Sequence, residues 1–352
     1  WEVGQWWVSG FVRRLRGLCA VADELSFHHI GSASALKSKS GGLDDDVRLL
    51  GGTPWAFSSD VLASAVDTLV VDEAGQLPFA ALVGASRAAR NLVLLGDPMQ
   101  LPAPSEGAHP PEGALSSLGY LLQDAVTVPP ELGVFLPVTY RMHPELCRIV
   151  SELVYEGRLV SHETTAKREL ALARRPRTEG VDSSHLLAKA AGVQFVAVEH
   201  SGNHRESQEE VAVICNLVDE LLACDVVGDE HSTSRGDGVN GGDGNARPLS
   251  RRDILVVAPY NAQRRRLAEA LPAGVRVGTV DLFQGQEAPV VLLSLCHSEF
   301  GPLSDAALEE ECEGGGIGGG RGMSFVLNRN RLNVALSRAQ CLAVVVASSK
   351  LV

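Results

Sequence analysis

Short apolar runs recur along this chain, and segments with helical spacing separate them. Several runs consist almost entirely of valine, leucine and isoleucine, as expected when helices cover both faces of a parallel sheet. The strand-sized runs are residues 68–71, 92–95, 194–198, 254–258, 275–280, 290–295 and 343–347. Helical spacing marks residues 207–224, 261–271 and 328–339. The first of these helices opens with Ser207 and, three residues later, Glu210, which is the pattern of a capping box. The alternation predicts an α/β fold of the doubly wound type with mainly parallel sheets.

The length of 352 residues predicts two domains, at roughly 100–200 residues each. We place them at residues 1–135 and 136–352, because the proline-containing stretch 129–137 has the composition of a hinge. Two glycine-rich segments, residues 228–247 and 309–322, are predicted to be flexible inserts at the surface of the second domain.

Composition excludes several classes of protein. No apolar run approaches the roughly 18 residues that span a membrane, so we expect no membrane partner. The seven cysteines are scattered without a CxxC pair, which argues against a disulfide framework or a zinc site. A reducing, intracellular compartment, cytoplasmic or nuclear, is therefore expected. The chain opens at Trp1 without a secretory signal pattern. The net charge of −12 argues mildly against a non-specific coat on nucleic acid.

The first two apolar runs end in polar side chains. One leads into Asp72 and Glu73, and the next leads into a Gly-Asp-Pro turn that holds Asp97, followed by Gln100. Ligands of open α/β sheets bind beyond the carboxyl ends of strands. An aspartate there can hold Mg²⁺ through its waters, and the next carboxylate can orient or deprotonate a water molecule. Each motif alone fits a solvated strand end equally well, whereas the two together suit one phosphate site.

Two further motifs place arginines where they could contact a phosphate. Tyr140 has a ring that can stack on a base, and the adjacent Arg141 could reach across a cleft between domains. In the predicted helix 328–339, Arg331 and Arg338 fall close to one helical face. A fixed guanidinium is suited to the charge on a transferred phosphoryl group. In isolation, this motif fits a solvated arginine-rich helix.

The remaining two motifs are turns that follow predicted strands. A helix begins at the first turn, where backbone N–H groups can bind a phosphate of a nucleic-acid backbone. The residues of this turn are Tyr260, Asn261 and Gln263. In the second turn, Gly285 permits close approach of the backbone, while Thr279 and Glu287 offer polar atoms. Any one of these residues alone fits an ordinary solvated loop.

The six segments occur in a fixed order within residues 70–339: VDEAGQ, LLGDPMQLP, TYRMHP, APYNAQ, TVDLFQGQE and LNVALSRA. They resemble motifs II and III, the linker arginine motif, and motifs IV, V and VI of superfamily 1 helicases, most closely in the Upf1/Dna2-like branch. They also resemble the helicase half of bacterial proteins in which a RecB-like nuclease precedes such a motor. The resemblance covers nearly all of the chain after about residue 49. It implies two RecA-like P-loop NTPase domains.

The resemblance also implies a role for each candidate residue. Asp72 would coordinate Mg²⁺, Glu73 would activate water, and Gln100 would sense the γ-phosphate of ATP. Arg141 and Arg338 would contact that phosphate from the second domain. Other nucleotide contacts would come from Asp97, from Tyr140 at the adenine, from Gly285, and from Glu287 at the ribose. Contacts to single-stranded DNA or RNA would come from Tyr260, Asn261, Gln263 and Thr279. ATP would close a cleft between the two domains, and hydrolysis would reopen it.

One motif of the family is missing from this sequence. No G-x-x-x-x-G-K-[ST] phosphate-binding loop occurs, so the first domain would be incomplete. The chain could be a fragment, which its start at Trp1 favours, or a degenerate relative. Because Glu73, Gln100, Arg141 and Arg338 are all retained, we expect a fragment of an active ATP-dependent helicase that hydrolyses ATP poorly alone. The alternatives are a non-hydrolysing nucleic-acid-binding module, and a repair factor whose nuclease domain lies upstream.

Overall fold

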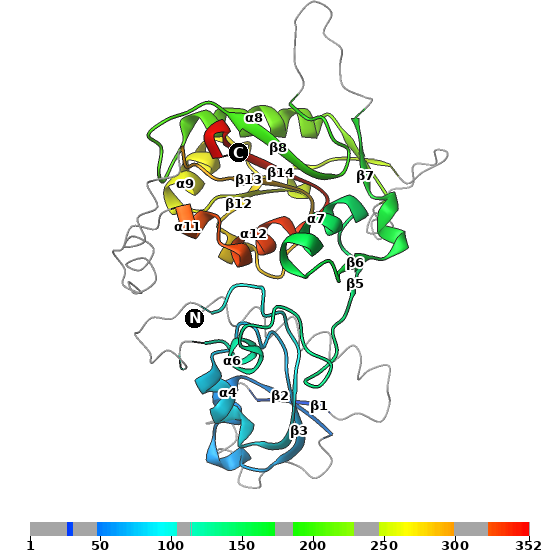
Figure 1. Cartoon of the computed structure of the whole chain (residues 1–352), viewed down its shortest axis with the longest axis vertical. Coiled ribbons are helices and arrows are strands. Elements are labelled where there is room, and N and C mark those ends of the chain that lie inside the picture. The colour runs from blue at the N-terminus through cyan, green and yellow to red at the C-terminus, as the bar shows by residue number, and fades with distance from the viewer. Residues whose placement is uncertain are drawn as a thin grey trace, which may run out of the picture. The chain divides into compact units, whose positions relative to one another are not determined.

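The chain divides into two compact units (Figure 1). The computed structural model describes residues 27–30, 48–103, 113, 115–172, 186–228, 246–298 and 323–351. The first unit consists of the described residues up to Pro98 and from Pro102 to Asp124. The second unit consists of Met99–Leu101 and the described residues from Ala125 onward. Residues 125–135, which we expected in the first domain, thus pack with the second unit. The expected inserts at 228–247 and 309–322 lie almost entirely outside the described residues.

Two pairs of parallel strands form the first unit. β1 (Phe27–Ile30) pairs with β2 (Leu49–Gly52), and β3 (Val66–Val71) pairs with β4 (Ala89–Leu94). The helices are α3 (Pro54–Phe57), α4 (Phe79–Ser86), α6 (Ser117–Leu122) and the 3₁₀ helix Asp60–Leu62. A small core holds these elements together, and it consists of Ala56, Phe57, Leu62, Leu69, Ala85 and Ala88.

A five-stranded parallel sheet is the centre of the second unit. Its strand order is β12-β11-β13-β14-β8, and every neighbouring pair is parallel. The strands are β8 (Gly192–Val198), β11 (Ile254–Val257), β12 (Arg276–Gly278), β13 (Ala288–Ser294) and β14 (Ala339–Ser348). All residues of β11 and β13 are buried, as expected for near-continuous apolar runs at the centre of a covered sheet.

Helices cover both faces of this sheet (Figure 1). One face carries α8 (Gln208–Leu222) and α9 (Asn261–Ala270), and the other carries α7 (Pro144–Val154) and α12 (Arg329–Leu336). Successive residues of β13 divide between the two cores: Val290 and Leu292 pack with α8 and α9, whereas Val291 and Leu293 pack with α7 and α12. This alternation is the period of a strand. The predicted α/β fold with mainly parallel sheets is confirmed.

Smaller elements complete the second unit. β5 (Val138–Thr139) pairs in parallel with β6 (Val160–Ser161). A three-stranded antiparallel sheet consists of β10 (Arg247–Pro248), β9 (Asp225–Val227) and β7 (Glu169–Ala171). The remaining helices are α11 (Met323–Val326) and the 3₁₀ helices Glu163–Lys167, Arg251–Asp253, Val280–Phe283 and Ser349–Leu351. None of the helices in the described ranges combines the length and the apolar character that crossing a bilayer requires.

The predicted capping box of α8 is only half formed. The Ser207 side chain accepts a hydrogen bond from the Glu210 backbone N–H (3.2 Å), as expected for an N-cap. The Glu210 carboxylate does not return to the Ser207 N–H, which donates instead to Gln263 Oε1 (2.9 Å). Glu210 is fully buried and bonds to other parts of the core, so packing overrides the local pattern.

Candidate functional site

Asp72 and Glu73 directly follow β3 at its carboxyl end. The Glu73 N–H donates to Asp72 Oδ1 (3.0 Å), and Gln76 Nε2 donates to Glu73 Oε2 (3.0 Å). Glu73 has a φ of 54°, a left-handed conformation that is uncommon outside glycine and that clusters at functional sites. Asp72 is exposed and Glu73 is half-buried. The strand end therefore offers one accessible carboxylate beside another that Gln76 orients.

Two glycines let the turn after β3 approach the turn after β4. A Cβ on Gly75 would overlap the Asp97 carbonyl, and a Cβ on Gly96 would lie 2.8 Å from the backbone nitrogen of Ala74. The Ala74 N–H donates to the Leu95 carbonyl (2.8 Å). Because neither position has room for a side chain, glycine is required at both. The two turns that carry the predicted carboxylates therefore lie at the same edge of this strand pair.

The donor set at this edge suits Mg²⁺ bound through water and phosphate. Magnesium usually keeps several waters and takes one or two carboxylates together with substrate phosphates. In the ranges that the structure describes, no three histidine, cysteine or acidic side chains gather into a metal cage. A site with one carboxylate, waters and phosphate oxygens needs only an accessible acidic side chain, which Asp72 provides. Asp72 is therefore the residue that would hold the ion.

In the second unit, Arg141 and Glu287 form an ion pair. Nε of Arg141 lies 2.6 Å from Oε2 of Glu287, and Nη1 of Arg141 donates to the Ser337 carbonyl (3.1 Å). Gln340 Nε2 donates to the other carboxylate oxygen of Glu287 (3.1 Å). The two paired side chains are 32% and 38% exposed, so a ligand could replace either partner at modest free-energy cost. Three motifs that are far apart in the sequence meet at this pair.

Arg338 supports the backbone next to these residues. It is buried, with Nε donating to the Val334 carbonyl (3.1 Å) and Nη1 donating to the Gln286 carbonyl (3.4 Å). These bonds tie the end of α12 to the turn of Gly285, whose φ of 74° favours glycine. Because Arg338 is buried, a contact with a phosphate would require its guanidinium to become exposed.

The candidate residues of the second unit occupy opposite edges of its sheet. Glu287 directly precedes β13 and Arg338 directly precedes β14, so both lie at the amino ends of parallel strands. Tyr260 lies three residues beyond β11, and Thr279 directly follows β12, so both lie at carboxyl ends. The predicted nucleotide contacts and the predicted nucleic-acid contacts are thus separated by the length of the strands.

Gln100 lies in a segment that α12 holds through its backbone. Asn330 Nδ2 donates to the Gln100 carbonyl (3.0 Å), and Asn333 Nδ2 donates to the Met99 carbonyl (3.0 Å). Leu101 is buried in the core beneath α7 and α12. The two asparagines are three residues apart and therefore share a helical face. The helix that leads to Arg338 thus also fixes the segment of Gln100.

Tyr140 presents an accessible ring, and Tyr260 does not. Tyr140 is 65% exposed and stacks on His162, with ring centres 4.4 Å apart and an interplanar angle of 26°. An exposed aromatic ring that is supported in this way suits stacking on a nucleobase. Tyr260 is only 8% exposed, and its ring stacks on Phe325 (5.7 Å).

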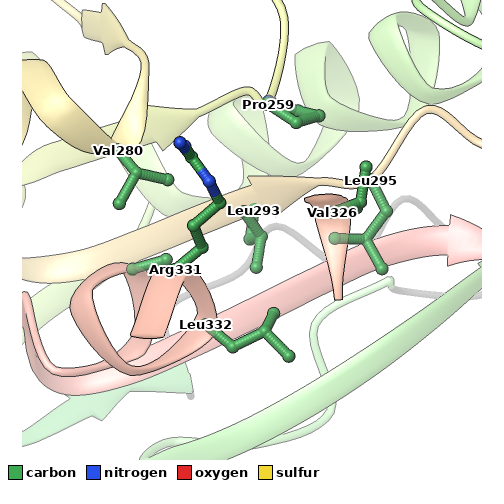
Figure 2. A pocket seen from close by; sticks show the side chains of 8 residues that line it. Pro259, Val280, Leu293, Leu295, Val326, Arg331 and Leu332 are labelled. Atoms are coloured by element: carbon green, nitrogen blue, oxygen red, sulfur yellow. The ribbon is translucent and has the colours of Figure 1, made fainter. Parts of the chain in front are cut away.

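A small, mostly apolar pocket lies at the carboxyl edge near Tyr260 (Figure 2). Pro259, Leu293 and Leu295 contribute to its lining, and Arg331 extends from α12 among these apolar side chains. The Arg331 guanidinium lies 3.8 Å from the centre of the Phe325 ring. The pocket has room for about one water molecule and is too small for a nucleobase.

The structure places Gln263 in the core, contrary to its expected contact with nucleic acid. Its Oε1 accepts from the Ser207 N–H (2.9 Å), and its Nε2 donates to the Ser207 carbonyl (3.2 Å) and to Ser294 Oγ (3.0 Å). With its amide engaged and no exposed surface, this side chain supports the turn from within. Asn261 is exposed, and Thr279 is half-buried without a side-chain capping bond, so both present polar atoms at this edge.

Comparison with known proteins identifies the family. Models described as an AAA domain match residues 118–350 and residues 45–104. The chain is 24% identical to the DNA replication ATP-dependent helicase/nuclease JHS1 of Arabidopsis thaliana, over 87% of this chain and 21% of that protein. It is 28% identical to the DNA-binding protein SMUBP-2 of Mesocricetus auratus, over 81% of this chain and 25% of that protein. The chain belongs to the Upf1/Dna2-like branch of superfamily 1 helicases.

The chain spans about a quarter or less of the length of these relatives. The helicase/nuclease dna2 of Schizosaccharomyces pombe is 26% identical over 78% of the chain and 18% of that protein. Among solved structures, an arterivirus nonstructural protein 10, a helicase determined with DNA, aligns over 91% of the helicase chain and 54% of its own chain. That alignment has a TM-score of 0.37 and 15% sequence identity.

Sequence patterns did not single out several residues that build this candidate site. Gln340 orients Glu287, and Asn330 and Asn333 hold the segment of Gln100. The only signal for them was their position in or beside the LNVALSRA segment. Their partners are distant in the sequence, so no local spacing could have indicated these contacts.

Proposed function

We propose that this helicase chain is part of an ATP-driven motor that moves along single-stranded DNA or RNA. The observation that carries the proposal is the convergence of Arg141, Glu287 and Arg338 at the amino edge of one parallel sheet. Three separate motifs supply these side chains, and a structural ion pair alone does not need such a convergence. An anion with several negative charges, such as a triphosphate, is the ligand that two neighbouring guanidinium groups suit best.

In the hydrolysis step, we assign separate tasks to the two carboxylates after β3. Asp72 would hold Mg²⁺, which supplies charge neutralisation at the phosphate oxygens when bound. Glu73, fixed by Gln76, would orient the attacking water and accept its proton. Gln100 and Asp97 are proposed to contact the nucleotide as well.

Nucleotide binding is proposed to change the partners of Arg141. A ribose hydroxyl would compete for the Glu287 carboxylate, and the γ-phosphate would compete for the Arg141 guanidinium. Both exchanges replace a partly exposed ion pair, which contributes little to stability. Tyr140 would stack on the base, while Gly285 would let the backbone approach the nucleotide. Arg338 would join the phosphate contacts once its buried guanidinium becomes accessible.

At the opposite edge, Asn261 and Thr279 are proposed to contact the sugar-phosphate backbone of the strand. The start of α9 adds backbone N–H groups that suit phosphate oxygens. Tyr260 and Gln263 would shape this edge from beneath.

We further propose that the parent protein carries a phosphate-binding loop that this sequence lacks. Two of the relatives are named as helicase/nucleases, so an upstream nuclease domain is also proposed. Without the loop, this chain alone is expected to hydrolyse ATP poorly.

The proposal is tested by changing Glu73→Gln in the full-length parent protein. The loss of a general base typically lowers turnover about 10²–10⁴-fold, so we expect strand-stimulated ATP hydrolysis to fall in that range while oligonucleotide binding is retained. Glu131→Gln, at an exposed acidic residue, is the matched control and should leave turnover unchanged. Unchanged hydrolysis in Glu73→Gln would contradict the role of Glu73. A parent that binds oligonucleotides but never hydrolyses ATP would favour the non-hydrolysing binding module.

A further inference from the structure

The turn that carries Tyr140 and Arg141 has four consecutive carbonyl groups, and one neighbouring segment binds all of them. The His162 N–H donates to the Thr139 carbonyl (2.9 Å), and Ser161 Oγ donates to the Met142 carbonyl (2.7 Å). The two carbonyls between them, those of Tyr140 and Arg141, both accept from Nη1 of Arg168, at 2.9 and 2.7 Å. Every donor therefore comes from residues 161–168.

The pair of hydrogen bonds from Arg168 has a clear electrostatic role. When two successive carbonyl oxygens converge on one point, their partial negative charges repel each other. A guanidinium nitrogen there supplies two N–H groups and a positive charge, and charge-assisted bonds are stronger than neutral ones. Arg168 thus stabilises a backbone conformation that would otherwise be unfavourable.

Arg168 is itself held in place by its own segment. It directly follows the 3₁₀ helix Glu163–Lys167, and its N–H donates to the Thr165 carbonyl (3.1 Å). Thr165 is fully buried, and its Oγ1 donates to the His162 carbonyl (2.8 Å). His162 also supports the Tyr140 ring by stacking. The backbone that carries Arg168 is therefore held in place by hydrogen bonds within residues 162–168.

We propose that Arg168 is a positioning residue that sets the orientation of Tyr140 and Arg141 for the nucleotide. This inference rests on the proposed function only in naming the nucleotide as the ligand of those two side chains. Arg168 donates hydrogen bonds to the backbone carbonyls of Tyr140 and Arg141, so its effect on a ligand would be transmitted through these two residues. Arg168 falls in none of the six sequence motifs.

A double-mutant cycle in the full-length parent protein separates this role from a general structural one. Arg168→Ala should lower kcat/KM for ATP at least about tenfold, while Arg168→Lys, which keeps a positive charge and several N–H donors, should recover part of the loss. Lys167→Ala, at the exposed neighbouring residue, is the control and should stay within about twofold of wild type. In a background with both Tyr140→Ala and Arg141→Ala, Arg168→Ala should add little. If Arg168→Ala lowered kcat/KM by the same factor in that background as in the wild type, the proposal would be overturned.

Hydrogen exchange in the same variants tests the positioning without relying on catalysis. The Arg141 N–H bonds to Thr139 Oγ1 and the His143 N–H bonds to the Gln340 carbonyl, so these amides report on the turn. We expect faster exchange of the peptide 139–143 in Arg168→Ala, with α8 unchanged. A wild-type parent without ATP turnover would sink the proposed function, while the exchange would still decide the role of Arg168. Unchanged exchange would overturn that role.

Discussion

His200 and Glu210 form a hydrogen-bonded pair in which neither side chain is exposed, with Nε2 of His200 3.0 Å from Oε1 of Glu210. The same carboxylate accepts from Ser294 Oγ (2.6 Å) and from the Cys296 N–H (3.0 Å to each oxygen). Cys296 has a φ of 51°, so this carboxylate holds a strained backbone just beyond β13. One buried side chain on α8 thus fixes the carboxyl end of the central strand.

Replacing Glu210 should destabilise the second unit strongly. Glu210→Ala leaves Ser294, Cys296 and His200 without their buried acceptor, and breaking a buried pair costs about 3–5 kcal/mol. Glu209→Ala, at the exposed preceding residue, should cost less than about 1 kcal/mol. Urea unfolding of both variants measures the difference, and equal losses would show that the network does not stabilise the fold.

Stability should depend on pH through Asp253. Burial alone would raise the pKa of this carboxyl, but hydrogen bonds from Arg247 and Ser250 outweigh burial and lower the pKa below its usual value. Because the pKa is lower in the folded state, the stabilisation is present above the unfolded pKa of about 3.9 and is lost as pH falls through the folded value. Asp253→Asn should therefore be less stable than wild type by about 1–3 kcal/mol at pH 7.

The same comparison at lower pH tests whether the pKa of Asp253 is lowered in the folded state. The difference in unfolding free energy between wild type and Asp253→Asn should be constant from pH 7 to pH 5 and should shrink below about pH 4. A difference that persists unchanged at pH 3 would contradict the assignment.

Cys296 should resist alkylation in the folded protein. Burial raises the pKa of its thiol far above the usual range, with a further contribution from the charge of Glu210, and the thiolate is the reactive form. Cys215 is only half-buried and should react with iodoacetamide first, although burial raises its pKa too. Peptide mass spectrometry measures the order, with urea-unfolded protein as the control in which both react. Equal rates in the folded state would contradict the burial of Cys296.

Gly75→Ala should distort the candidate metal edge. The added methyl group would overlap the Asp97 carbonyl, which is backbone and cannot move aside cheaply, so we expect a loss of about 1–3 kcal/mol in the first unit. Gly133→Ala, whose added Cβ would lie 3.2 Å from a flexible Val128 methyl group, should cost less. Thermal unfolding compares the two. An unchanged unfolding temperature in Gly75→Ala would mean that the turns after β3 and β4 lie farther apart than the structure places them.

The sheet of the second unit was largely predictable, because its strands are buried on both faces and are therefore apolar throughout. The run 290–295 corresponds to β13 (Ala288–Ser294), and the bounds differ because the first strand residues include Pro289, which breaks the apolar pattern. Helix α9 was predicted at 261–271 and ends at Ala270. Periodicity and length were sufficient for both elements.

The roles of single polar side chains were much less predictable. Gln263 stands at a helix start, where a polar residue is ordinarily solvated, yet it is buried because Ser207 and Ser294 reach it from 56 and 31 residues away. Arg168 had no signal at all, since its contact depends on the pairing of β5 with β6, and two-residue strands are too short to show a period. Such contacts arise only when the whole fold is formed.

The opposite placement of the two groups of contacts on one sheet has a mechanical consequence. β13 has seven residues, which at about 3.3 Å per residue corresponds to a rod of roughly 23 Å. Hydrogen-bonded neighbours on both sides and packed helices on both faces make that rod stiff. A displacement of the backbone beside Glu287 would therefore be transmitted along β13 to the opposite edge of the sheet with little bending of the strand.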